Sequence, residues 1–167
     1  RPHVAIITHI PEIPVHIEFF GTREAIVDEK SALAKYSRKD ATVILNKDSQ
    51  YVFEIAKNTN RKVLSIGFID DADVTANNIE RIVTNDGIFG MKFNAVLKGK
   101  TMPVFAPGFI AKHQVYGALF ALAAGEALGY DTEQMAYSMQ SLTFTPGRLN
   151  PLLGINNTLI LDDRSEE

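Results

Sequence analysis

An alternation of short apolar runs with helical patterns most strongly constrains the fold of this 167-residue chain. The runs cover residues 4–8, 41–45 and 63–68, and none contains a charged residue. Such continuous runs are typical of strands that are covered on both faces. A helical pattern separates each run from the next. We therefore expect an α/β fold built on a mainly parallel sheet with helices on its faces.

The middle of the chain has patterns typical of antiparallel strands. Residues 79–84, 87–97 and 101–106 have strand patterns, and Lys98-Gly99-Lys100 predicts a tight connection between the last two. The aspartate-rich stretch over residues 70–75 predicts a turn. We expect these strands to form an antiparallel, β-rich layer at the edge of the parallel sheet.

The helix predicted over residues 110–128 is apolar on almost every side, which indicates burial between two layers. Gly129 ends it, and Asp131-Thr132-Glu133-Gln134 is the pattern of a capping box that begins a further short helix. The sequence then predicts a loop after residues 146–148 and a final strand over 158–161.

Composition excludes several classes of function. The net charge is −3 without a long block of either sign, which argues against a basic nucleic-acid-binding surface. Without cysteine, the chain has no disulfides, thiolate zinc sites or cysteine nucleophiles. The most apolar run, residues 115–124, is too short to span a membrane, and the first residues lack a signal-peptide layout. Because the chain begins beside a strand and without methionine, we expect it to be part of a longer protein.

Lys30 is the most unusual residue of the helix predicted over 21–36. Thr22 is a good N-cap for this helix. The apolar residues share one face with Lys30 in its middle, and they are Ile26, Val27, Leu33 and Ala34. An ammonium group on a core-facing stripe is costly unless it is paired, neutralised or modified. The alternative is that the side chain reaches past the stripe into solvent.

Several stretches, taken in order, resemble the Mur ligases over nearly the whole chain. The stretches that carry the resemblance are residues 5–8, His16-Ile17-Glu18-Phe19-Phe20-Gly21-Thr22, Glu29-Lys30-Ser31, Leu45-Asn46-Lys47-Asp48, Phe93-Asn94-Ala95, Pro107-Gly108, His113-Gln114-Val115-Tyr116, Gly147-Arg148 and Leu161-Asp162-Asp163. Within this family, the chain is most similar to the ligases that add D-alanyl-D-alanine to UDP-N-acetylmuramoyl-tripeptide.

The resemblance implies a cytoplasmic enzyme of peptidoglycan precursor synthesis and cell wall biogenesis that uses ATP and Mg²⁺. In this family ATP phosphorylates a substrate carboxylate, and the incoming amine attacks the acyl phosphate to give an amide, ADP and phosphate. Catalysis of such phosphoryl transfer consists mostly of positioning and charge neutralisation. The partners implied are UDP-N-acetylmuramoyl-tripeptide and D-alanyl-D-alanine.

The resemblance also implies a metal site. The family lysine that matches Lys30 is carbamylated, which turns a cation into a carboxylate that helps to hold magnesium. His16 matches the family's metal-binding histidine, so the implied catalytic and metal-binding residues are Lys30 and His16. Glu18 is a candidate for the surroundings of the metal or the substrate side, or else a solvated loop carboxylate.

On the nucleotide side the resemblance implies a role for four residues. They are His113, Arg148, Asp163 and Asn46. His113 could instead be a capping or core histidine, and helix capping could equally account for Asn46 and Asp48. A guanidinium such as that of Arg148 suits contacts with nucleotide phosphates.

The chain also departs from the family pattern. Family members carry a phosphate loop ending in Gly-Lys-Thr or Gly-Lys-Ser upstream of the position of Val4, whereas no G-x-x-x-x-G-K-[ST] motif occurs in these residues. Gly117 stands where the family has an asparagine, and Arg164-Ser165-Glu166 replaces the usual Ser-Tyr-Asn after the final aspartates.

From these departures we expect residues 1–154 to be part of a central domain that lacks the phosphate loop, and 155–167 to begin a C-terminal ligase domain. Alone, the chain is expected to be inactive. The alternatives are a non-catalytic binding or scaffold module, or another amide ligase of the superfamily such as a folylpolyglutamate or cyanophycin type. If no strand precedes Val4, an exposed sheet edge predicts self-association.

Overall fold

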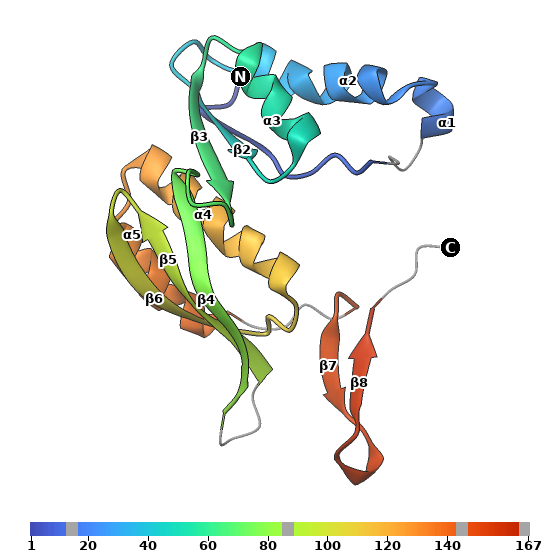
Figure 1. Cartoon of the computed structure of the whole chain (residues 1–167), viewed down its shortest axis with the longest axis vertical. Helices are drawn as coiled ribbons and strands as arrows, with labels where there is room; N and C mark the ends of the chain where they lie inside the picture. The colour runs from blue at the N-terminus through green and yellow to red at the C-terminus, as the bar shows by residue number, and fades with distance from the viewer. Residues whose placement is uncertain (13–16, 85–88, 143–146, 164–167) are drawn as a thin grey trace.

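A six-stranded sheet forms the centre of the computed structural model, which describes residues 1–12, 17–84, 89–142 and 147–163 (Figure 1). The strands follow one another across the sheet in chain order, with β1 to β4 parallel and β4 to β6 antiparallel. They are β1 (Val4–Ile7), β2 (Thr42–Asn46), β3 (Lys62–Gly67), β4 (Val74–Val83), β5 (Phe89–Leu97) and β6 (Lys100–Pro107). The predicted α/β fold with an antiparallel edge is confirmed.

Helices cover the sheet, and predicted capping residues fix three of their ends. They are α1 (Ile17–Phe20), α2 (Arg23–Lys35), α3 (Gln50–Lys57), α4 (Val115–Leu128) and α5 (Thr132–Ser138), with short 3₁₀ turns η1 (Lys112–Gln114), η2 (Met139–Ser141) and η3 (Ile155–Asn157). The Thr22 hydroxyl accepts a hydrogen bond from the backbone of Ala25, and the Asp131 carboxylate caps α5. Gly129 ends α4 in the left-handed region, with φ of 79°. These three caps confirm the predicted helix ends.

The helix predicted over 110–128 is interrupted at its start. Ala111 is extended and η1 separates it from α4. The Gln114 side-chain oxygen accepts hydrogen bonds from the backbone N–H groups of Ile110 and Ala111, at 2.7 and 2.9 Å. Because a side chain satisfies these N–H groups, the chain turns here before the regular helix begins.

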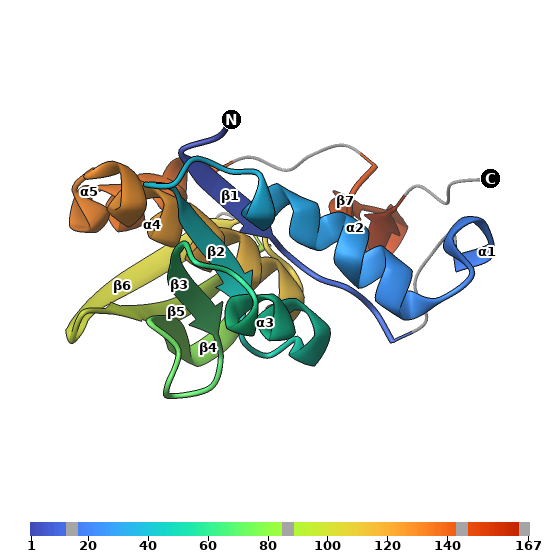
Figure 2. The same ribbon diagram turned by 90° about the horizontal axis from the view of Figure 1, so that it is seen from above.

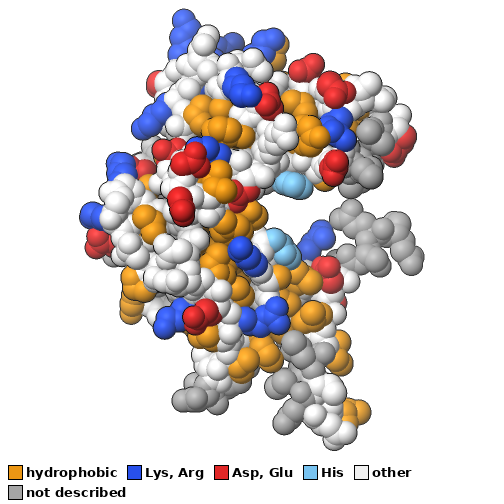
Figure 3. All heavy atoms as spheres, in the orientation of Figure 1, with side chains coloured by type: hydrophobic (Ala, Val, Ile, Leu, Met, Phe, Trp, Pro, Cys, Tyr) orange, Lys and Arg blue, Asp and Glu red, His pale blue; other side chains and the backbone are white. Residues whose placement is uncertain are grey.

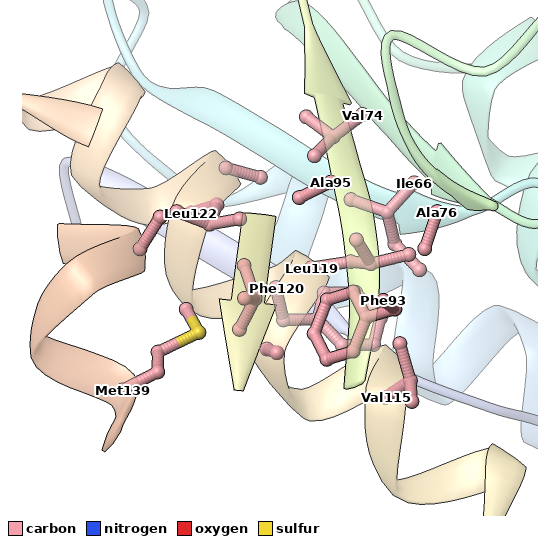
Figure 4. Packing of buried hydrophobic residues seen from close by; sticks show 14 of the residues in the cluster. Ile66, Val74, Ala76, Phe93, Ala95, Val115, Leu119, Phe120, Leu122 and Met139 are labelled. Carbon is pink, nitrogen blue, oxygen red and sulfur yellow. The ribbon is translucent and has the colours of Figure 1, made fainter. Parts of the chain in front are cut away.

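The sheet separates two hydrophobic cores, and β2 contributes to both. Val43 and Leu45 pack with α2 and α3, whereas Ile44 packs on the other face in the core that contains α4. Figure 2 shows these helices around the parallel strands. Figure 4 shows Leu119 and Phe120 of α4 packed near Phe93 of β5. The predicted burial of the apolar helix is therefore confirmed.

The connection from β3 to β4 is shorter than the predicted acidic turn, because β4 begins at Val74 rather than at residue 79. The two parallel strands pair only at Ile66–Val74 and Gly67–Thr75. Just before this ladder, one carboxylate oxygen of Asp73 accepts hydrogen bonds from both the backbone N–H and the hydroxyl of Ser65. The Asp73 side chain thus accepts the hydrogen bond from the Ser65 N–H that a backbone carbonyl of a neighbouring strand would otherwise accept.

A two-stranded hairpin, β7 (Asn150–Leu153) and β8 (Leu159–Asp162), forms a second sheet. Residues 150–153 were predicted to belong to a loop, and this expectation is wrong. The antiparallel register pairs Asn150 with Asp162 and Leu153 with Leu159. The two strands of the hairpin lie on either side of residue 154. The predicted boundary between a central domain (1–154) and a C-terminal domain (155–167) stays a prediction.

One edge of the main sheet is formed by β1, whose Ile6 is 36% exposed. In the described part of the chain, no helix is both long and apolar enough to cross a bilayer.

Candidate nucleotide-binding site

A pocket of about 410 Å³ lies where the carboxyl ends of β1 and β2 meet the beginning of α4. Its lining residues are Thr8, His9, Asn46, His113, Tyr116, Gly117 and Phe120. Figure 3 shows the molecular face hollowed between its two lobes, with histidine side chains on either side of the hollow. Ligands of open α/β sheets bind outside the carboxyl ends of the strands, and the pocket has the volume of a small-molecule site.

Asn46 is the last residue of β2 and is only 4% exposed. Its side-chain oxygen accepts a hydrogen bond of 3.0 Å from the backbone N–H of Asp48. This contact turns the chain at the end of the strand and fixes the orientation of the amide. Asp48 or Ser49 was expected to cap α3; Ser49 stands at the N-cap position and makes no side-chain hydrogen bond to the helix.

Tyr116 connects α4 to the carboxyl edge of the sheet. Its hydroxyl donates to Asp48 Oδ2 at 2.8 Å, and its ring stacks on Phe68 with 4.2 Å between the ring centroids. Partial burial, together with the nearby Asp48 carboxylate, raises the pKa of Tyr116 well above its usual value, so the hydroxyl stays a donor. The ammonium of Lys112 lies 4.6 Å from the centroid of the Phe68 ring.

His113 belongs to η1 and is exposed, so it is not a core histidine. Gly117, one turn along, has nothing within 4 Å of the position where a Cβ would stand. The pocket is therefore open on the side of Gly117. The structure brings together Asn46 and His113, two of the four residues implied on the nucleotide side.

Lys30 lies in the middle of the predicted helix face and is exposed. Ile26 and Ala34 of α2 are buried at 4% and 1%, as the periodicity predicts, but Lys30 between them is exposed. The side chain of Lys30 reaches solvent, which was the alternative considered, and Leu33, expected on the same face, is 45% exposed. His16 lies outside the described residues, and the described part of the chain contains no cluster of three metal-binding side chains.

Arg148 and Asp163 lie at the base of the β7–β8 hairpin and do not line the pocket. Here Asp162 accepts a hydrogen bond of 2.9 Å from the backbone of Gly147, and Asp163 accepts one of 3.3 Å from that of Leu149. The two aspartates therefore hold the start of the hairpin together.

Four pocket residues were missed as site candidates from the sequence: Thr8, His9, Tyr116 and Phe120. Thr8 and His9 follow β1 directly, and this position at a strand's carboxyl end was the available signal. No sequence signal linked Tyr116 to Asp48, because the two are 68 positions apart.

Comparison with known proteins identifies the family. The model of the Mur ligase middle domain matches residues 1–125. The UDP-N-acetylmuramoyl-L-alanyl-D-glutamate--2,6-diaminopimelate ligase of Chlamydia pneumoniae is 29% identical over 139 residues, which are 83% of this chain and 28% of that protein.

Solved structures are similar over almost the whole chain. MurF from Acinetobacter baumannii has a TM-score of 0.82 and 26% identity, covering 97% of this chain and 34% of that one. MurF ligase from Thermotoga maritima in complex with ADP has a TM-score of 0.79 and 22% identity, covering 96% and 35%. The chain thus spans about a third of the length of these relatives. Because the family model matches well over half of its residues, the chain belongs to the Mur ligase family.

Proposed function

We propose that the chain is the nucleotide-binding part of an ATP-dependent amide ligase that adds D-alanyl-D-alanine to UDP-N-acetylmuramoyl-tripeptide in the cytoplasm. The pocket at the carboxyl ends of β1 and β2 carries this proposal, because its position suits a nucleotide in this fold. The likeness to MurF structures, one of them in complex with ADP, supports the choice of reaction and nucleotide.

Within the pocket the polar residues have distinct tasks. We propose that the Asn46 amide and the His113 imidazole hydrogen-bond the nucleotide, and that Phe120 forms an apolar wall. Arg148 and Asp163, at the base of the hairpin, are proposed to contact phosphate and ribose, respectively. A guanidinium fork suits a phosphate, and a carboxylate suits ribose hydroxyls.

Magnesium would neutralise charge on the transferring phosphate. The described residues do not by themselves form its site, since Lys30 is an exposed amine. A lysine amine becomes an oxygen ligand only after carbamylation. The role of Lys30 and His16 as the metal-binding pair therefore stays a proposal. Exposure of Lys30 leaves its nitrogen accessible to CO₂.

These 167 residues contain no phosphate-loop motif, so we propose that they bind the nucleotide without catalysing the ligase reaction. The exposed edge at β1, where Ile6 is partly exposed, supports the proposal of self-association. Light scattering at increasing concentration tests this point, and a monomer throughout would contradict it.

Calorimetric titration with Mg-ADP and Mg-ATP tests the proposed function. We expect binding by the unmodified chain, at least fivefold weaker binding by His113→Ala, and unchanged binding by the matched control His3→Ala, whose exposed histidine lies outside the pocket. Lys30→Ala is expected to weaken Mg²⁺ binding. Absence of nucleotide binding would favour the non-catalytic scaffold module, and phosphate release with both substrates would refute the proposed inactivity.

A further inference from the structure

We propose that Asp48 is a positioning residue of the nucleotide pocket. Its backbone N–H holds the Asn46 amide in place, and its carboxylate holds the beginning of α4. This inference rests on the proposed function, because it concerns how the same pocket is built. Asp48 does not line the pocket itself. It acts through two residues that do, Asn46 and Tyr116.

One oxygen of the Asp48 carboxylate joins two separate elements. Oδ2 accepts a hydrogen bond of 2.6 Å from the backbone N–H of Phe68, just after β3, and one of 2.8 Å from the Tyr116 hydroxyl on α4. Hydrogen bonds to a charged acceptor are stronger than those between neutral groups. The carboxylate thereby connects the first turn of α4 to the carboxyl edge of the sheet.

Gly67 makes room for this arrangement. A Cβ at position 67 would lie 2.9 Å from Asp48 Oδ1 and 3.2 Å from its carboxylate carbon. Only a residue without a side chain allows the carboxylate to approach the end of β3 this closely. The glycine and the aspartate therefore form one local structure.

The backbone of Asp48 orients the neighbouring binding residue. Its N–H occupies the Asn46 side-chain oxygen, which leaves the amide nitrogen as the group that can donate to a ligand. Asn46 is 4% exposed and lines the pocket, so its amide nitrogen belongs to the pocket wall. A ligand with an acceptor atom, such as a purine ring nitrogen or a phosphate oxygen, would satisfy this donor.

The stacked pair Phe68–Tyr116 extends the same structure to the pocket wall. The hydroxyl of Tyr116 holds the ring against Phe68, and the same residue lines the pocket. Loss of the Asp48 carboxylate would release this hydroxyl and leave the Phe68 N–H without its acceptor. The pocket wall formed by Tyr116 would then lose its fixed geometry.

The test measures ADP binding by calorimetry for Asp48→Ala, Asp48→Asn and Tyr116→Phe. Asp48→Ala is expected to bind ADP about tenfold more weakly. Asp48→Asn is expected to stay within about threefold of the unmodified chain, because one carbonyl oxygen can accept both hydrogen bonds. Asp70→Ala is the matched control, since it removes the same charge from an exposed position nearby and should leave binding unchanged.

A double-substitution cycle separates positioning from a general loss of stability. The Asp48→Ala/Tyr116→Phe variant should bind ADP no more weakly than Asp48→Ala alone. Alkaline titration of tyrosine absorbance should show the pKa of Tyr116 falling towards its usual value in Asp48→Ala. If Asp48→Ala does not fold, Asp48→Asn and Tyr116→Phe still test the geometry.

The outcomes are distinct. Unchanged ADP binding by Asp48→Ala, or equal weakening by Asp48→Asn and Asp48→Ala with Tyr116→Phe unaffected, overturns this inference alone. Absence of ADP binding by the unmodified chain overturns the proposed function and this inference with it.

Discussion

Replacing Asp73 with alanine should destabilise the chain, because it removes the carboxylate that accepts hydrogen bonds from Ser65 at the start of β4. Asp73 Oδ2 accepts a hydrogen bond of 2.7 Å from the backbone N–H of Ser65 and another from the Ser65 hydroxyl, while the Asp73 N–H donates to that hydroxyl at 3.0 Å. Ser65 is only 4% exposed, so water cannot readily replace the lost acceptor.

The magnitude follows from these contacts. A buried donor left without an acceptor costs about 1–3 kcal/mol. Because the Asp73 side chain is itself exposed, we expect a total near 2 kcal/mol, which for a chain of this size corresponds to a melting temperature lower by about 4–8 °C. Asp73→Asn keeps a carbonyl oxygen in place and should lose less than about 1 kcal/mol.

Urea denaturation followed by circular dichroism measures both variants, with Asp70→Ala as the control for loss of an exposed charge in the same loop. A loss below about 0.5 kcal/mol for Asp73→Ala would refute the reasoning, since a change that small is typical of ordinary surface substitutions. Equal losses for Asp73→Asn and Asp73→Ala would instead show that charge, rather than the hydrogen bonds, stabilises this connection.

Three further predictions follow from the cores, the caps and the raised tyrosine pKa. Leu119→Ala, at a fully buried position, should cost about 3–4 kcal/mol in urea denaturation, whereas Leu33→Ala, where the side chain is 45% exposed, should cost less than about 1 kcal/mol; similar losses would contradict the assignment of the core. Gly129→Ala should cost about 1 kcal/mol because φ is 79° there, and a gain in stability would contradict the cap. Tyr116 has a folded pKa raised above the ordinary value of 10.0, so its contribution to stability is fully present below pH 10 and is lost as pH rises through the folded pKa. Tyr116→Phe should therefore lose less stability between neutral and strongly alkaline pH than the unmodified chain, and parallel stability curves would contradict the assignment.

Most of the main sheet and its helix ends could be predicted because local signals specify them. Thr22, Gly129 and Asp131 determine where helices begin or end through contacts within a few residues. The Lys98–Gly99 turn has positive φ at both residues, 52° and 76°, as expected for a tight hairpin connection. Such features depend little on the rest of the fold.

What could not be predicted depends on distant neighbours. Helical periodicity places Lys30 on the same side as Ile26 and Ala34, but it does not say whether the sheet extends beneath the middle of that side. Pro151 and the short length of β7 give it a weak strand pattern in the sequence. Pairing with β8 stabilises it as a strand. The Asp48–Tyr116 contact requires knowledge of the tertiary structure.

Because β2 belongs to both hydrophobic cores, the described part of the main sheet has no internal boundary along which one side can unfold alone. Ile44 faces one core, Val43 and Leu45 face the other, and Asn46 at the end of the same strand reaches the pocket. The two halves should unfold as a single cooperative unit. A nucleotide bound at the end of this strand would raise the melting temperature of the entire sheet, including the helices that never touch it.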